Sequence, residues 1–136
     1  MGFLRLKKVV FGIFFGFRCR SWVKIDLKIE DDKIIFNYKN EFKQVLINIL
    51  SNAKDILIDR KIKNAQITII IDMNSITIRD NGGGIKLDNI EKIFEPYFST
   101  KKDGLGIGLY MSKMIIEKNM DGMLTVSNIM DSPFQP

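Results

Sequence analysis

The chain has 136 residues, of which 46% are hydrophobic and 27% charged, the composition of an ordinary globular domain that can bury a core of its own. Its net charge of +5 originates in residues 1–28, which carry seven Lys/Arg and one acidic residue, so the sequence predicts no basic face for nucleic acid. There is no histidine and a single cysteine, Cys19. This excludes a histidine general base, a histidine metal site and an internal disulfide, and it suits a reducing cytoplasm.

Residues 1–22 are an unassigned basic and aromatic segment. Its apolar run, residues 9–17, is too short for the about 20 residues that cross a bilayer, and no small-residue cleavage site follows it. Three interpretations stay open: a poorly ordered or partner-packed remnant, a weak interfacial membrane anchor, and a genuine structural element.

From residue 23 onward, hydrophobic spacing predicts regular elements. Residues 23–29 alternate apolar and polar side chains as a half-buried strand does, and residues 34–36 are predicted to be a second short strand. Residues 41–58 carry an apolar stripe at helical spacing. Residues 66–71 and 76–79 are predicted to form a β-hairpin.

The second half of the chain begins with a loop-rich region, residues 81–103. A helix is expected at about residues 105–118, followed by a turn at Asp121-Gly122 and a strand at residues 124–129.

This order of elements predicts an α+β fold, a two-layer sandwich in which helices pack on one face of a mixed, mostly antiparallel sheet. The predicted domain covers residues 23–130, and residues 131–136 form a tail without an element signal.

The run Asp80-Asn81-Gly82-Gly83-Gly84 follows the second strand of the predicted hairpin. A plain strand-to-loop turn is the simpler interpretation, because Asp, Asn and Gly all favour turns. Three successive glycines exceed what one turn needs, however, and each has an entropic cost. A backbone without side chains can close over phosphates, while a carboxylate at a strand end can accept the amino group of a base. The run therefore indicates a nucleotide site.

A polar face on the helix at 41–58 is formed by Gln44, Asn48, Asn52 and Asp55. A solvated helix face is one interpretation. Asparagine is a poor residue for a helix interior, so two of them one turn apart carry a local cost. Their neutral amide oxygens suit a Mg²⁺ ion that is bound mainly by substrate phosphates.

A second glycine-rich run opens the later helix and reads Gly104-Leu105-Gly106-Ile107-Gly108-Leu109. The spacing and the lack of a preceding βαβ unit do not fit a dinucleotide fingerprint. Helix N-terminal amides can still face phosphate oxygens. Lys101 and Lys102 could add charge there, although a lysine pair in a loop is usually only solvated.

The chain resembles the catalytic ATP-binding domain of sensor histidine kinases, in the wider group with DNA gyrase, Hsp90 and MutL. The resemblance covers residues 23–129 and rests on four motifs in family order. They are the asparagine box Asn48-Ile-Leu-Ser-Asn52-Ala53, the first glycine box Asp80-Asn-Gly-Gly-Gly84-Ile85, the phenylalanine box Phe94-Glu-Pro-Tyr-Phe98 and the second glycine box Gly104-Leu-Gly-Ile-Gly108-Leu109. It implies a Bergerat-type ATP-binding fold with ATP and Mg²⁺ as cofactors.

The resemblance also implies a role for each motif residue. Asn52 would hold Mg²⁺ between the ATP phosphates, Asp80 would accept the adenine amino group, and Asn48 and Lys101 would be catalytic. The other residues implied to bind the nucleotide or to form its lid are Asp55, Gly82, Gly84, Ile85, Phe94, Phe98, Gly104, Leu105, Gly106, Ile107, Gly108 and Leu109.

Asn48 separates the kinases from the hydrolysing members, which carry a glutamate there. An asparagine cannot accept a proton from water, so the γ-phosphoryl group would be kept for a protein acceptor. The implied partners are a dimerisation domain with a phosphoacceptor histidine and, indirectly, a response regulator. Two alternatives stay open: a catalytically inactive nucleotide-binding or interaction fragment, and an ATPase of the gyrase or Hsp90 type.

Several positions depart from the family pattern. Asp55 stands where lysine is frequent, Leu105 stands where threonine is common, and Asp121-Gly122 replaces a frequent Gly-Gly pair. The closing strand after residues 124–129 and the histidine-bearing helices are missing from the sequence. We therefore expect a cytoplasmic fragment of a longer protein, connected to a membrane only through a missing sensor part or weakly through its N-terminal segment.

Overall fold

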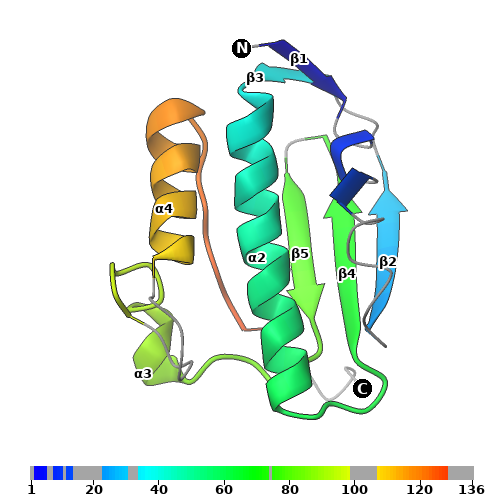
Figure 1. Ribbon diagram of the computed structural model, residues 1–136, viewed down its shortest axis with the longest axis vertical. Coiled ribbons are helices and arrows are strands. Elements are labelled where there is room, and N and C mark those ends of the chain that lie inside the picture. Colours follow the sequence, from blue (N-terminus) through cyan, green and yellow to red (C-terminus); the bar gives the residue numbers. More distant parts are fainter. Residues whose placement is uncertain are drawn as a thin grey trace.

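The computed structural model describes residues 2–5, 8–10, 12–13, 23–30, 34–73, 75–98 and 107–128 of the chain. Figure 1 shows a long helix that runs alongside the strands of the larger sheet, which has three strands, and a second helix on its other side. The strands are β1 (Gly2–Arg5), β2 (Lys24–Ile29), β3 (Ile34–Asn37), β4 (Gln66–Ile71) and β5 (Ile76–Asp80). The helices are α2 (Lys39–Asp59), α3 (Leu87–Ile90) and α4 (Gly108–Met114), which continues as the π-helical turn η1 (Ile115–Asn119).

The larger sheet has the strand order β2-β4-β5. β2 pairs in parallel with β4, so that Ile25 lies opposite Ile67, and β4 pairs antiparallel with β5, so that Ile69 lies opposite Ile78. The predicted hairpin is thereby confirmed. A parallel pair requires a crossover connection, which β3 and α2 provide here. β1 and β3 form a separate antiparallel pair at one end of α2 (Figure 1).

The core lies between α2 and the sheet. Burial alternates along β4, where Ile67, Ile69 and Ile71 are buried while the residues between them are half-buried. These isoleucines belong to the same cluster as the buried stripe of α2, which includes Leu50 and Leu57. Helix and strand periodicities that face one another in this way give two packed layers, so the predicted α+β sandwich is confirmed.

Part of the N-terminal segment contributes to this core. Residues 8–10 and 12–13 are helical, and the side chains of Val9, Val10 and Ile13 are at most 7% exposed within the core cluster. Among the three interpretations of the segment, these residues support the structural element; residues 14–22 lie outside the described part. No helix among the described residues has both the length and the apolar content that crossing a bilayer requires.

Two sequence expectations near the C-terminus need correction. The helix expected at residues 105–118 begins as α4 at Gly108 and ends in a π-helical turn, with residues 105 and 106 outside the described part. The strand expected at residues 124–129 is wrong, because residues 122–128 form no regular secondary structure. Apolar alternation predicts a strand only where a neighbouring strand can pair with it, and no described strand pairs with this segment.

The turn predicted at Asp121-Gly122 is confirmed. Asp121 has a left-handed backbone with φ 52°, and the Gly122 N–H donates a 2.9 Å hydrogen bond to the carbonyl of Ile116. Aspartate is among the non-glycine residues that tolerate this conformation best. The turn sends the chain from η1 back toward the loop after β5 (Figure 1).

Candidate functional site

The first glycine box begins where β5 ends. One carboxylate oxygen of Asp80, Oδ1, accepts a 2.8 Å hydrogen bond from the N–H of Gly82. Gly82 is buried, and a Cβ atom there would lie 2.8 Å from Asp80 Oδ1 and 3.0 Å from Ile56 Cγ2. Only glycine therefore allows this loop to approach α2 while its amide orients the Asp80 carboxylate.

Asn81, the second residue of the box, ties the loop to the beginning of β4. Its Oδ1 accepts a 2.8 Å hydrogen bond from the Gln66 N–H, and its Nδ2 donates a 2.9 Å bond to the Asn64 carbonyl. Both polar groups of the side chain are thus used within the fold. For Asn81, the simpler interpretation of the run as a strand-to-loop turn is sufficient.

Two residues outside the motifs hold the rest of the loop, and sequence reasoning missed both. Arg60 Nη1 donates to the carbonyls of Gly82 and Gly84, at 2.6 and 2.9 Å. Asn128 pairs with the backbone of Ile85: its Oδ1 accepts from the Ile85 N–H at 2.7 Å and its Nδ2 donates to the Ile85 carbonyl at 2.6 Å. No local sequence signal marks these contacts, because they join positions 22 to 43 residues apart.

The last glycine of the box is required by its backbone and by its neighbour. Gly84 has φ +83°, a region that other residues rarely adopt. A Cβ atom there would also lie 2.9 Å from Asn128 Oδ1, so a side chain would disturb the pairing of Asn128 with Ile85. These contacts within the fold explain the glycine at position 84. The predicted approach of a nucleotide to this backbone stays a prediction.

The asparagine box meets the second glycine box through Asn48. Its Nδ2 donates to Ser112 Oγ at 3.2 Å and to the Gly108 carbonyl at 3.4 Å, while its Oδ1 accepts a 2.9 Å bond from Gln44 Nε2. Ser112 is fully buried and its hydroxyl donates to the Gly108 carbonyl at 2.8 Å. Ser112, which the motifs do not include, thus connects α4 to α2.

Asn52 lies on a face of α2 that contacts the second glycine box at one end and the first glycine box at the other. Asn48, Asn52 and Ile56 follow at intervals of four residues, so they lie one above another on the helix. Asn48 contacts the backbone of Gly108 at one end, and Ile56 faces Gly82 at the other end, about 12 Å away along the helix axis. Asn52 lies half-buried between them.

The other predicted site residues are placed as follows. Asp55 is half-buried on α2, Ile107 and Leu109 are half-buried around the start of α4, and Gly108 is exposed there. Lys101, Gly104, Leu105 and Gly106 lie outside the described residues.

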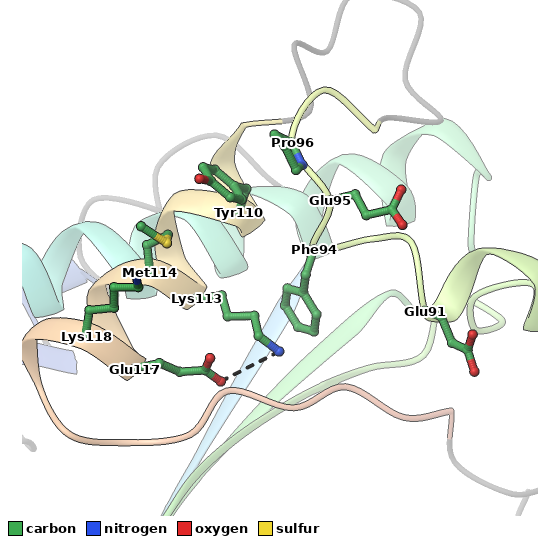
Figure 2. A pocket seen from close by; sticks show the side chains of 9 residues that line it. All are labelled: Glu91, Phe94, Glu95, Pro96, Tyr110, Lys113, Met114, Glu117 and Lys118. Atoms are coloured by element: carbon green, nitrogen blue, oxygen red, sulfur yellow. Dashed lines mark ion pairs between the residues drawn. The ribbon is translucent and has the colours of Figure 1, made fainter.

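The phenylalanine box packs against α4. Phe94 is half-buried, and the ammonium nitrogen of Lys113 lies 4.6 Å from the centre of its ring, a cation–π distance. Glu117 holds that lysine by a 3.6 Å ion pair, which Figure 2 marks with a dashed line. Phe98 is half-buried, while Tyr97 between them is 77% exposed and has φ 67°.

A pocket of about 340 Å³ lies between the phenylalanine box and α4, lined among others by Phe94, Pro96, Tyr110 and Met114 (Figure 2). These α4 residues lie on the side of the helix away from Gly108 and Ser112, which face α2. None of Asn48, Asn52 and Asp80 lines the pocket. It is therefore separate from the site on the asparagine face of α2.

Substitutions of Asn48 and Ser112 should have coupled effects on stability, because the two side chains are in contact. Because both partners are polar and Ser112 is buried, we expect Ser112→Ala and Asn48→Ala each to lower the free energy of unfolding by about 1 kcal/mol. The double variant should lose less than the sum, with a coupling energy of about 0.5–1 kcal/mol in urea denaturation. In a second cycle, Gln44→Ala replaces Ser112→Ala and measures the coupling of Asn48 with its exposed partner. Strictly additive losses for Asn48→Ala and Ser112→Ala would contradict the contact.

Comparison with known proteins identifies the family. Residues 37–133 match the family described as histidine kinase-, DNA gyrase B- and HSP90-like ATPases, which is most of the chain. This protein belongs to that family of ATP-binding domains, as the four motifs implied.

Sensor kinases are prominent among its relatives. The chain is 35% identical over 103 residues to the two-component sensor PprA of Pseudomonas aeruginosa, covering 70% of this chain and 11% of PprA. It is 35% identical over 108 residues to sporulation kinase E of Bacillus subtilis, covering 77% of this chain and 14% of the kinase. The chain thus spans a small part of the length of these relatives.

Solved structures agree with this family. The catalytic domain of histidine kinase ThkA, in a nucleotide-free form, superposes with a TM-score of 0.73 at 27% identity, covering 86% of this chain and 80% of that one. The mycobacterial sensor histidine kinase MprB shares the fold, with a TM-score of 0.72 at 18% identity over 87% of this chain and 79% of that one.

Proposed function

We propose that this chain is the ATP-binding catalytic domain of a two-component sensor histidine kinase. It would bind Mg·ATP and present the γ-phosphoryl group to a histidine on another domain or chain, since it contains none itself. The observation that carries the proposal is the face of α2 on which Asn52 lies between the two glycine boxes. Family membership and the sensor-kinase relatives support it.

Asp80 is proposed to select adenine. Its Oδ1 is already bound to the Gly82 N–H, so its second oxygen is the acceptor left for the amino group of the base. The backbone of Gly82, Gly84 and Ile85 would then lie along the nucleotide. Because the loop itself holds this carboxylate, recognition of the base would depend on the conformation of the glycine box.

The opposite end of the nucleotide is proposed to lie at the asparagine box. The described residues contain no group of three His, Cys, Asp or Glu side chains able to hold a metal ion. The neutral amide oxygen of Asn52 fits a Mg²⁺ that takes most of its ligands from phosphates and water. When bound, Mg²⁺ would neutralise phosphate charge. Asp55, one turn further toward the first glycine box, would support the nucleotide from the same helix.

The second glycine box, together with a lid anchored by the phenylalanine box, is proposed to enclose the phosphates. Lys101, Gly104, Leu105 and Gly106, together with Ile107, Gly108 and Leu109, would supply charge and backbone amides. Phe94 would anchor the lid through its contact with Lys113 of α4, with Phe98 as a second anchor.

The proposed chemistry needs positioning and charge neutralisation. A histidine nitrogen of the partner attacks the γ-phosphorus, the bond to the bridging oxygen breaks, and ADP leaves. Asn48 carries an amide, which cannot act as the base that activates water for hydrolysis. Its Nδ2 donates to Ser112 and Gly108, so its part would be to hold α4 near the phosphates. The phosphoryl group would pass from the partner histidine to a response regulator, and a cytoplasmic location, where ATP is supplied, is part of the proposal.

The test is phosphotransfer in trans. The chain is mixed with Mg²⁺, γ-labelled ATP and a separate dimerisation domain from one of the sensor-kinase relatives, with a histidine-to-alanine acceptor as the control. We expect acid-labile, base-stable label on the intact acceptor and little free phosphate. ATP binding without transfer would favour an inactive nucleotide-binding module, rapid hydrolysis would favour a gyrase- or Hsp90-like ATPase, and no ATP binding would refute the proposal.

A further inference from the structure

Arg60 is placed to control the first glycine box from the end of α2. It is the C-cap residue of the helix, where a positive charge interacts favourably with the helix dipole. Its backbone N–H donates to the Ile56 carbonyl at 3.0 Å, which fixes where the side chain leaves the helix. From there Nη1 reaches the carbonyls of Gly82 and Gly84 at 2.6 and 2.9 Å, both charge-assisted hydrogen bonds.

A hydrogen bond that holds a carbonyl also fixes the direction of the N–H in the same peptide plane. In a trans peptide the C=O and the following N–H point in opposite directions, and the described chain contains no cis peptide. The Gly84 carbonyl points to Arg60, so the Ile85 N–H points away, and it donates to Asn128 Oδ1 at 2.7 Å. Arg60 and Asn128 therefore hold the Gly84–Ile85 peptide from opposite sides.

The bond to Gly82 extends the influence of Arg60 to the carboxylate at the end of β5. Arg60 holds the carbonyl of Gly82, and the N–H of the same residue donates to Asp80 Oδ1 at 2.8 Å. A rotation about the φ or ψ bond of Gly82 changes the angle between its N–H and its C=O, so both hydrogen bonds can persist only in this backbone conformation. The orientation of the Asp80 carboxylate thus depends on the guanidinium group at the end of α2.

We propose that Arg60 is a positioning residue that orders the first glycine box before a nucleotide binds. Consecutive glycines lose more conformational freedom on ordering than any other residues, so a free loop would lose that entropy on binding. A loop already held by Arg60 and Asn128 avoids most of this loss, which raises affinity through preorganisation. The inference rests on the proposed function, because it assigns Arg60 a role in the same ATP site without contact with the nucleotide.

The test compares Arg60→Met with Lys63→Met, which removes the same charge from an exposed position three residues further along the chain. Two quantities are measured on the full chain: the Kd for Mg·ATP by calorimetry, and amide hydrogen exchange at Gly83 and Ile85 without nucleotide. We expect Arg60→Met to weaken ATP binding about tenfold and to accelerate exchange at Ile85 several-fold, with a thermal midpoint close to that of Lys63→Met. Arg60→Lys, which keeps the charge and three donors, should recover part of both effects.

A purely structural role for Arg60 would lower the thermal midpoint and leave the Kd of the folded protein unchanged, which would overturn the proposal. Faster exchange without a change in Kd would also overturn it. If the unaltered chain binds no ATP, the proposed function fails, and the exchange data alone then decide whether Arg60 orders the loop. If Arg60→Met does not fold, Arg60→Lys supplies the same comparison.

Discussion

Replacing Asp80 by asparagine is expected to weaken ATP binding about 100-fold while the stability of the free protein stays nearly unchanged. The asparagine Oδ1 can still accept the hydrogen bond that Asp80 receives from the Gly82 N–H, so the loop keeps its internal contact. The second oxygen becomes an NH₂ group, which would face the adenine amino group donor to donor. Calorimetric titration with Mg·ATP, together with thermal melts of the free protein, measures both effects.

The base preference of this variant gives an independent readout. Guanine carries an acceptor oxygen where adenine carries the amino group, so Asp80→Asn should narrow or reverse the preference for ATP over GTP. Asp88→Asn, at an exposed position of α3, is the matched control and should change neither affinity. Equal ATP affinity of Asp80→Asn and the unaltered protein would show that residue 80 does not read the base.

Gly82→Ala should lower the free energy of unfolding by about 1–3 kcal/mol and weaken ATP binding at the same time. The added Cβ would lie 2.8 Å from Asp80 Oδ1 and 3.0 Å from Ile56 Cγ2. The Asp80 side chain can move away only by giving up the 2.8 Å hydrogen bond from the Gly82 N–H, and Ile56 is branched at Cβ and therefore stiff. Urea denaturation and nucleotide titration of the same samples would separate the two losses.

Gly12→Ala is the control for this change. Gly12 is an exposed helical residue, and a Cβ atom added there would meet no other atom within 4 Å. Because alanine also favours the helix over glycine, this variant should be as stable as the unaltered protein or slightly more stable. A Gly82→Ala protein as stable as the control, with unchanged ATP affinity, would contradict the close approach of the loop to α2.

Local spacing was sufficient to predict the elements that build the layers. The apolar stripe of α2 is a property of consecutive residues, and it indicates which side chains of the helix are buried. In β4 three isoleucines follow one another, so only the structure shows which of them face the core. The segment after Asp121 shows the limit of this reasoning. Its alternation resembles that of a strand, but a strand needs a paired neighbour, and alternation contains no information about pairing.

The candidate site also contains residues that the sequence could predict and residues that it could not. Asp80 and Gly82 could be singled out because an Asp-Asn pair followed by three glycines is unusual in itself. Arg60, Ser112 and Asn128 could not, since each acts through one or two hydrogen bonds to residues 22, 64 and 43 positions away. An isolated arginine, serine or asparagine is common on any surface, so only the fold reveals its partner.

The parallel pairing of β2 with β4 has a consequence for the order of folding. The β4–β5 hairpin joins neighbours in the chain and can form within microseconds, whereas β2 finds its partner only after the whole crossover has been made. On the ribosome, the isoleucines of β2 therefore emerge well before the strand that shelters them. That interval is when a nascent chain of this type is most exposed to aggregation and most dependent on chaperones.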